Sequence, residues 1–219
     1  MTFANFLSVM ETLLGENGCK WDKEQTHESL REFMLEECYE AIDAINRQDI
    51  NALKEELGDV LLQVVFHAKL AEKAGNFTID DVIAAITHKL VSRHSHVFGS
   101  DTAANAADVL QIWGKNKQKE RAEKSLKSVM EDIPKALPAL IRAAKVLKRS
   151  KMQKSCPETV INDIKNMLDN MKNNSDKIMR NEEFGLIMLQ MVNLSDILEI
   201  NAEFSLTNAT EAFINTFSE

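Results

Sequence analysis

The chain has 219 residues, a formal net charge of −8, and only seven glycines and three prolines. So few helix breakers, together with an aromatic share of 6%, favour an all-α protein. The negative charge argues against a groove that binds nucleic acid by neutralising phosphates. The three cysteines are widely spaced and form no CxxC pair, so neither a disulfide framework nor a zinc site is indicated.

The N-terminal segment predicts an amphipathic helix rather than a signal peptide. Its sequence, MTFANFLSVMETLL, contains Glu11 and lacks a basic start. No apolar run approaches the roughly 18 residues of a membrane span. We therefore expect a cytoplasmic protein that does not interact with a membrane.

Apolar residues at helical spacing predict a series of helices along the chain. They run from about 2 to 14, 27 to 47, 50 to 74, 79 to 93, 106 to 123, 138 to 147, 157 to 171, 177 to 199 and 207 to 217. Residues 15–27, 94–105 and 125–135 are expected to be loops, and 148–156 a linker. Thr78 is expected to cap its helix together with Asp81, and Pro138 and Pro157 to open two later helices.

Two neighbouring helices carry pairs of acids beside their apolar stripes. The first pair is Glu37 and Glu40, and the second is Glu56 and Asp59. Because a short connection makes the two helices antiparallel neighbours, the four carboxylates are expected to converge. Clustered carboxylates repel one another and need cations or protons. Oxygen ligands favour a hard ion, so the pattern predicts a site for Mg²⁺, with Mn²⁺ as a substitute.

The simpler alternative is that acids three residues apart form an ordinary solvated helix face. Two such pairs on facing helices, each beside an apolar stripe, favour the metal site instead. The stripes consist of Leu30, Phe33, Met34, Ala41, Ile42 and Ile45 in the first helix, and Leu53, Leu57, Val60, Leu61 and Val64 in the second.

Four sequence blocks occur in order: GCKWDKEQTHESL at 18–30, LEECYEAIDAI at 35–45, EELGDVLLQVVFHA at 55–68 and KLVSRHSHVFG at 89–99. They resemble the signature of the MazG-type nucleoside triphosphate pyrophosphohydrolases. The resemblance is dense over residues 1–150 and implies a helical bundle and a homodimer. It also implies hydrolysis of nucleoside triphosphates to monophosphate and pyrophosphate, a house-cleaning of the nucleotide pool.

The resemblance implies a role for several of the polar residues. Glu37, Glu40, Glu56 and Asp59 would hold the metal, and Glu36 would act beside Glu37 in catalysis by orienting or deprotonating water. An exposed Glu36 paired with a Lys or Arg is the equally weighted alternative.

Basic and aromatic residues are assigned to the substrate. Lys89 and Arg93 match the basic segment of the family and are assigned to the triphosphate, with Lys115 as a further phosphate contact. Trp113 fits either base stacking or packing between helices. Trp21 and Lys23 match the WDK block and are expected to shape the mouth of the site, although Lys20 and Ser95 replace prolines that are usual in the family.

His67 lies near the apolar face of its helix, so a hydrogen-bonded packing role is expected rather than metal ligation. The last third of the chain repeats the pattern of the first half. EELGDVLLQ at 55–63 aligns with EEFGLIMLQ at 182–190, and 35–40 aligns with 164–169. The second copy keeps its apolar positions but has Asn166 at the place of Glu37 and Leu186 at the place of Asp59.

We therefore expect a duplicated helical unit whose second copy is degenerate. The predicted domains are a MazG-like catalytic domain at 1–124, a connecting helix and linker at 125–156, and a structural or dimerising repeat at 157–219. The apolar segment GLIMLQMVNLSDIL at 185–198 offers surface for a homodimer.

Two other functions compete with this interpretation. A di-iron carboxylate bundle normally needs Glu-x-x-His on each of two helices, and the sequence does not provide that pattern. A non-catalytic nucleotide-binding regulatory or scaffolding MazG homologue is the remaining alternative. The intact set of four acids argues against it, because a scaffold gains nothing from clustered carboxylates.

Overall fold

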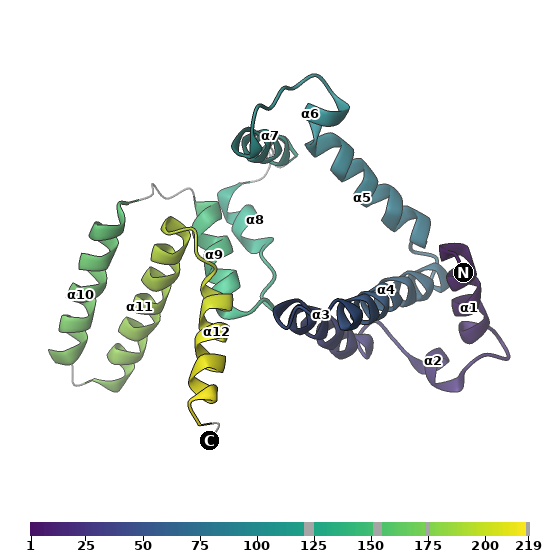
Figure 1. Cartoon of the computed structure of the whole chain (residues 1–219), viewed down its shortest axis with the longest axis horizontal. Helices are drawn as coiled ribbons and strands as arrows, with labels where there is room; N and C mark the ends of the chain where they lie inside the picture. Colours follow the sequence, from purple (N-terminus) through teal and green to yellow (C-terminus); the bar gives the residue numbers. More distant parts are fainter. Residues whose placement is uncertain (121–124, 151–154, 174–175, 218–219) are drawn as a thin grey trace. The chain divides into compact units, whose positions relative to one another are not determined.

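The computed structural model describes residues 1–120, 125–150, 155–173 and 176–217. These residues form twelve helices and no strand, which confirms the all-α class (Figure 1). The chain divides into two units, Met1–Lys117 and Gln118–Glu219. None of the helices in the described ranges combines the length and the apolar character that a membrane span requires.

The first unit is built from seven helices, the last of which runs two residues past the division. They are α1 (Phe3–Leu14), α2 (Lys20–Glu24), α3 (Leu30–Asn46), α4 (Ile50–Lys73), α5 (Ile79–Arg93), α6 (Ser95–Phe98) and α7 (Ala106–Lys119). The long helices match the predicted ones, and residues 121–123 of the helix predicted at 106–123 lie outside the described residues. By contrast, α2 and α6 lie in segments that are predicted to be loops. Helices of four or five residues are too short to show a periodic apolar pattern, which is why the sequence did not reveal them.

Side-chain caps fix where the main helices begin. The Thr78 hydroxyl accepts from the Asp81 backbone N–H, and the Asp81 carboxylate accepts from the Thr78 backbone N–H, so the predicted capping box is confirmed. Asp49 caps α4 through the backbone N–H groups of two following residues. Gly75 follows α4 with φ of 73°, a left-handed conformation that glycine adopts without strain.

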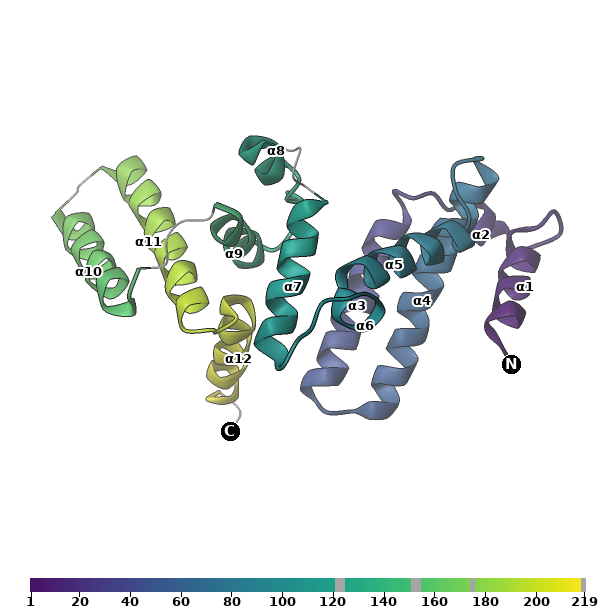
Figure 2. The same ribbon diagram turned by 90° about the horizontal axis from the view of Figure 1, so that it is seen from above.

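The helices α3 and α4 form an antiparallel hairpin closed by residues 47–49 (Figure 2). One side of the hairpin packs against α1 and α5 around a core of Met10, Leu30, Val65, Phe66, Ala68 and Ile79. The predicted apolar stripes are only partly buried within this chain. Leu57 is 54% exposed and Leu61 41% exposed, because helical periodicity identifies an apolar face but not whether the same chain covers it.

The second unit repeats this arrangement with different packing around it. Its helices are α8 (Leu126–Glu131), α9 (Ala139–Ser150), α10 (Pro157–Asn173), α11 (Lys177–Ile197) and α12 (Ala202–Asn215). The helices α10 and α11 lie side by side, and Val160, Ile164 and Ile187 form the core between them. Helix α9 packs against α11 and α12.

The second half differs from the sequence prediction at α8, at the start of α12 and in the predicted linker. Helix α8 lies within a predicted loop, and its N-terminus is fixed by the Ser125 hydroxyl, which accepts from the Ser128 backbone N–H. Helix α12 begins five residues earlier than predicted, because Asn201 provides an N-cap for it. Residues 148–150 of the predicted linker are instead the last residues of α9, because helical hydrogen bonding continues past Leu147, and residues 151–154 lie outside the described residues.

Candidate metal centre

A cluster of carboxylates lies on the α3–α4 hairpin. Glu37 of α3 and the α4 residues Glu56 and Asp59, which are three residues apart, each place one carboxylate oxygen within 4.8 Å of the other two. All three side chains are partly buried. Glu37 and Asp59 are equally far along the chain from Gln48 in the connection, so the antiparallel pairing itself brings them face to face.

The cluster is electrostatically strained in the absence of a cation. Partial burial, followed by the negative charges of Asp59 and Glu40, raises the pKa of Glu37 above its ordinary value. The pKa of Glu56 is also raised, by partial burial and then by the charges of Glu40 and Asp59. Raised pKa values mean that the folded chain favours protons here, and a cation would serve the same purpose.

The two remaining predicted acids lie at the edge of the cluster. Glu40 is exposed and contributes to the raised pKa of Glu56 through its charge and a shared hydrogen bond. Glu36 is also exposed, and its charge helps to raise the pKa of Glu37. Within the described residues no Lys or Arg forms an ion pair with any of these five acids. The alternative in which Glu36 pairs with a basic side chain is therefore not the arrangement observed.

The predicted substrate residues of α5 and α7 form a second group. The Arg93 guanidinium lies 5.9 Å from the centroid of the Trp113 ring, and the Lys117 ammonium lies 5.7 Å from it. The Asn116 amide donates to the Ser95 hydroxyl at 2.8 Å, which ties α7 to α6. Lys89 and Lys115 are exposed on the same two helices. Trp113 is 38% exposed, so it is more than a buried packing residue.

The predicted residues of the WDK block are separated by the fold. Trp21 contacts Phe33 of α3 edge to face, with ring centroids 5.9 Å apart, and Phe33 lies one turn before Glu37. Lys23 instead lines a pocket with Lys69 and Lys73 at the C-terminal end of α4. Lys73 is about 20 Å along the helix from Asp59, given the rise of an α-helix. Within one chain, Lys23 is therefore not part of the carboxylate cluster.

The structure contains a hydrogen-bonded pair of histidines, of which the sequence predicted only the hydrogen bonding of His67 and not its partner. His67 makes the expected hydrogen bond, and its partner is His27, with the two Nδ1 atoms 2.8 Å apart. The ring planes differ by 5° and the centroids are 5.1 Å apart, which fits two rings meeting nitrogen to nitrogen in one plane. Partial burial and the charge of His27 lower the pKa of His67. The two histidines are forty residues apart in sequence, so no local pattern could pair them.

Helix α4 carries one further buried polar residue, Gln63, that the sequence analysis did not identify. Gln63 lies one turn beyond Asp59 and one turn before His67, and it is only 5% exposed. Its Oε1 atom is buried and has no hydrogen-bond partner among the described residues. The sequence did contain a signal for Gln63: it is four residues after Asp59 and four before His67, and residues at this spacing share one helix face.

These features define an all-α protein with an oxygen-lined centre on a helical hairpin. The donor set fits a hard divalent cation, because it consists of carboxylates alone and no described basic side chain neutralises it. Glu37, Glu56 and Asp59 would hold such an ion, with Glu40 beside them.

Comparison with known proteins agrees with this class. Residues 25–98 match the model of the MazG nucleotide pyrophosphohydrolase domain. The chain is 40% identical over 222 aligned positions to the nucleoside triphosphate pyrophosphohydrolase of Escherichia coli K12, covering 97% of this chain and 84% of that one. It is 39% identical to the nucleoside triphosphate pyrophosphohydrolase/pyrophosphatase MazG of Thermotoga maritima, with 99% and 84% covered. The chain belongs to the MazG family.

A third relative matches over a shorter stretch. The nucleoside triphosphate pyrophosphohydrolase of Mycolicibacterium smegmatis is 45% identical over 131 residues, which cover 59% of this chain and 40% of the relative. The matched domain, residues 25–98, includes all of the hairpin that carries the carboxylate cluster.

Proposed function

We propose that this protein hydrolyses nucleoside triphosphates to nucleoside monophosphate and pyrophosphate in a reaction that depends on Mg²⁺. The observation that carries the proposal is the convergence of Glu37, Glu56 and Asp59 on the hairpin that the family match covers. The names of the relatives, nucleoside triphosphate pyrophosphohydrolases, support the substrate class. The expected location in the cytoplasm follows from this role in the nucleotide pool.

The reaction consumes one water molecule and breaks the anhydride bond between the α and β phosphates. When bound, a divalent cation supplies charge neutralisation for the triphosphate and acidifies water. The chain's own contribution is to hold that charge in place through Glu37, Glu40, Glu56 and Asp59. Glu36, which is exposed at the edge of the cluster, is proposed to orient the attacking water and to accept its proton.

The basic and aromatic group of α5 and α7 is proposed to bind the rest of the substrate. Lys89, Arg93 and Lys115 would contact phosphate oxygens, and the exposed face of Trp113 would stack on the base. Arg93 lies over the Trp113 ring, so phosphate and base contacts would come from adjacent side chains.

We further propose that the protein is a homodimer. Apolar side chains next to the carboxylate cluster are partly exposed in this chain: Phe33 by 36%, Met34 by 37% and Leu57 by 54%. Covering such a surface with a second copy is favourable, since each Å² of apolar surface removed from water contributes about 25 cal/mol. Light scattering after size exclusion checks the proposal, and a monomer at micromolar concentration would contradict it.

The proposed reaction is tested by product analysis. The purified protein is incubated with Mg²⁺ and a panel of ribo- and deoxyribonucleoside triphosphates, and the products are separated by ion exchange. We expect monophosphate and pyrophosphate, and we expect the Glu37→Gln variant to form neither. Diphosphate and orthophosphate would show that the wrong bond had been assigned. Nucleotide binding without turnover would favour the regulatory homologue instead.

A further inference from the structure

A second polar site lies in the first unit, away from the carboxylate cluster. Helices α1, α2 and α4 line an open pocket of about 430 Å³, which is within the size range of small-molecule sites. Its walls include Leu14 of α1 and Leu70 of α4, so part of the lining is apolar. Three lysines, Lys23, Lys69 and Lys73, also line it.

The three lysines differ in the number of hydrogen bonds that their ammonium groups already donate within the chain. Lys69 is 12% exposed and donates to the carboxylates of Glu11 at 2.8 Å and Glu72 at 2.9 Å. These hydrogen bonds raise its pKa and hold it in the charged form. Lys23 is exposed and donates to the backbone carbonyl of Glu16 at 2.6 Å. Lys73 makes no ion pair or side-chain hydrogen bond within the described residues.

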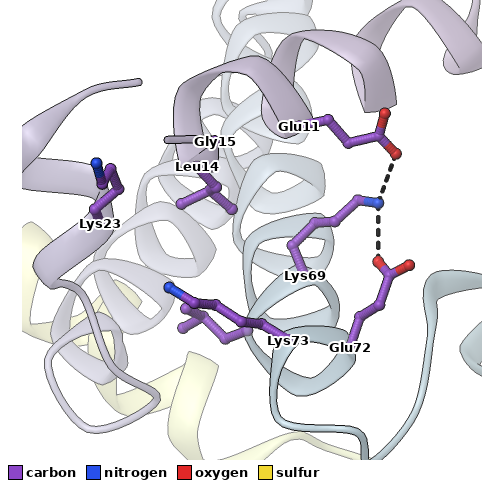
Figure 3. Close-up of a pocket in the computed structure, with 8 residues that line it drawn as sticks. Glu11, Leu14, Gly15, Lys23, Lys69, Glu72 and Lys73 are labelled. Atoms are coloured by element: carbon purple, nitrogen blue, oxygen red, sulfur yellow. Dashed lines mark hydrogen bonds and ion pairs between the residues drawn. The ribbon is translucent and has the colours of Figure 1, made fainter. Parts of the chain in front are cut away.

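The charges are distributed unevenly over the cavity. Figure 3 shows the ammonium groups of Lys23 and Lys73 to one side, and the Glu11–Lys69–Glu72 ion pairs on the other. Each ammonium group has three donors, so Lys23 and Lys73 together keep most of theirs for a ligand.

We propose that this cavity, the lysine pocket, binds a phosphorylated small molecule, with its phosphate against Lys23 and Lys73 and its organic part against Leu14 and Leu70. The site is independent of the carboxylate cluster, because Lys73 lies about 20 Å along α4 from Asp59. It needs no metal, since the lysines supply the positive charge. Lys23 therefore serves this second site rather than the proposed hydrolytic one.

The test measures binding of inorganic pyrophosphate and of AMP by calorimetry, in EDTA and at constant ionic strength. Without a divalent cation, the carboxylate cluster cannot contribute to binding of either anion. We expect saturable binding of one anion per chain, with AMP bound more tightly because of its organic part. The double variant Lys23→Gln/Lys73→Gln should weaken binding at least about tenfold, since charge-assisted hydrogen bonds are lost.

Matched controls separate this site from general attraction to lysines. The double variant Lys20→Gln/Lys54→Gln removes one exposed lysine from α2 and one from α4, the helices that carry Lys23 and Lys73. Neither lysine lines the pocket, so this variant should bind the anions like the parent. The Asp59→Asn variant should also retain binding, even though the proposed hydrolysis would be lost. The four lysines are exposed and Asp59 is only partly buried, so circular dichroism is expected to show unchanged helix content.

Three results would overturn the proposal. One is the absence of saturable binding of either anion. Another is equal weakening in the two lysine double variants, which would mean nonspecific attraction. The last is loss of binding in Lys89→Gln with retention in Lys23→Gln/Lys73→Gln, which would assign the anion to the proposed substrate group on α5 and α7. None of these results depends on whether the protein hydrolyses nucleoside triphosphates.

Discussion

The hairpin of α3 and α4 and the hairpin of α10 and α11 share a backbone plan but differ in chemistry. The helices α3 and α10 have 17 residues each, and both hairpins are followed by a further helix of similar length, α5 or α12. In the first hairpin three carboxylates converge, whereas the described residues of the second contain no group of three such ligands. Apolar packing thus preserves a fold after its polar site has been replaced.

The replaced positions show how the second hairpin differs. Asp169, which aligns with Glu40, forms an ion pair with Lys172 at 3.2 Å. Leu186 takes the place of Asp59 and is 53% exposed, and Ile187 beside it is buried in the core. At these two positions the second hairpin has an ion-paired acid and an exposed apolar side chain, where the first hairpin has carboxylates that could hold a metal. The comparison predicts that metal chemistry is confined to the first hairpin.

The largest expected effect is on catalysis. Asp59→Asn should lower the rate of nucleoside triphosphate hydrolysis about 10²-fold or more, because removing even an outer-shell partner of a metal ligand typically costs 10- to 100-fold. Glu40→Gln should lower it less, since Glu40 is exposed at the edge of the cluster. Asp169→Asn, at the position corresponding to Glu40, is the matched control and should leave the rate unchanged. A comparable loss in Asp169→Asn would break the comparison.

The next effect is on stability. A divalent cation that binds only the folded chain at 100 to 1,000 times its Kd should stabilise the first unit by about 3–4 kcal/mol. Thermal unfolding with Mg²⁺ and with EDTA measures this difference. In Glu56→Gln the difference should vanish, and in EDTA the variant should melt above the parent, because a repelling charge is gone. A Glu183→Gln variant that lost the Mg²⁺ response would contradict the account.

The cluster also predicts a pH dependence in EDTA. The pKa values of Glu37 and Glu56 are raised from 4.5, so the folded chain binds more protons than the unfolded chain between 4.5 and the raised values. Stability should therefore decrease as the pH rises through this window and stay reduced above it. Denaturant unfolding over a pH series measures the slope. If Glu56→Gln gave the same slope as the parent, the cluster would not be its source.

The smallest expected effect concerns the histidine pair. All five histidines lie in the first unit, so only that unit is expected to show this effect. The pKa of His67 is lowered from 6.5, so the unfolded chain binds more protons just below pH 6.5 and stability should fall as the pH drops through that value. The hydrogen bond between His67 and His27 contributes about 0.5–1.5 kcal/mol by the usual magnitude, which limits the size of this effect.

This effect is separated from that of the acids by substitution. His67→Gln should remove the loss of stability below pH 6.5 in unfolding experiments, whereas His88→Gln on the exposed face of α5 should not. Loss of the pH dependence in both variants, or in neither, would show that the pair does not act as described.

The features that could be predicted from the sequence are those that depend on residues close together in the chain. The capping box of Thr78 and Asp81 and the spacing of Glu37, Glu56 and Asp59 could be found because each depends on helical periodicity and a short connection. The exposure of Leu57 could not be found, because periodicity does not reveal which face a partner covers. The hydrogen bond between His27 and His67, and the pocket that Lys23 and Lys73 both line, join segments that are distant in sequence. Only the packing of α1, α2, α3 and α4 creates them.

The most direct test of the account is to locate the bound metal ion within the chain. Mn²⁺ added to isotopically labelled protein broadens the amide signals of nearby residues. The account predicts broadening around Glu37, Glu40, Glu56 and Asp59, its loss in Asp59→Asn, and no broadening around Asp169 or Glu183. Equal broadening at the two hairpins, or signals around Glu37 that do not respond to Mn²⁺, would contradict it.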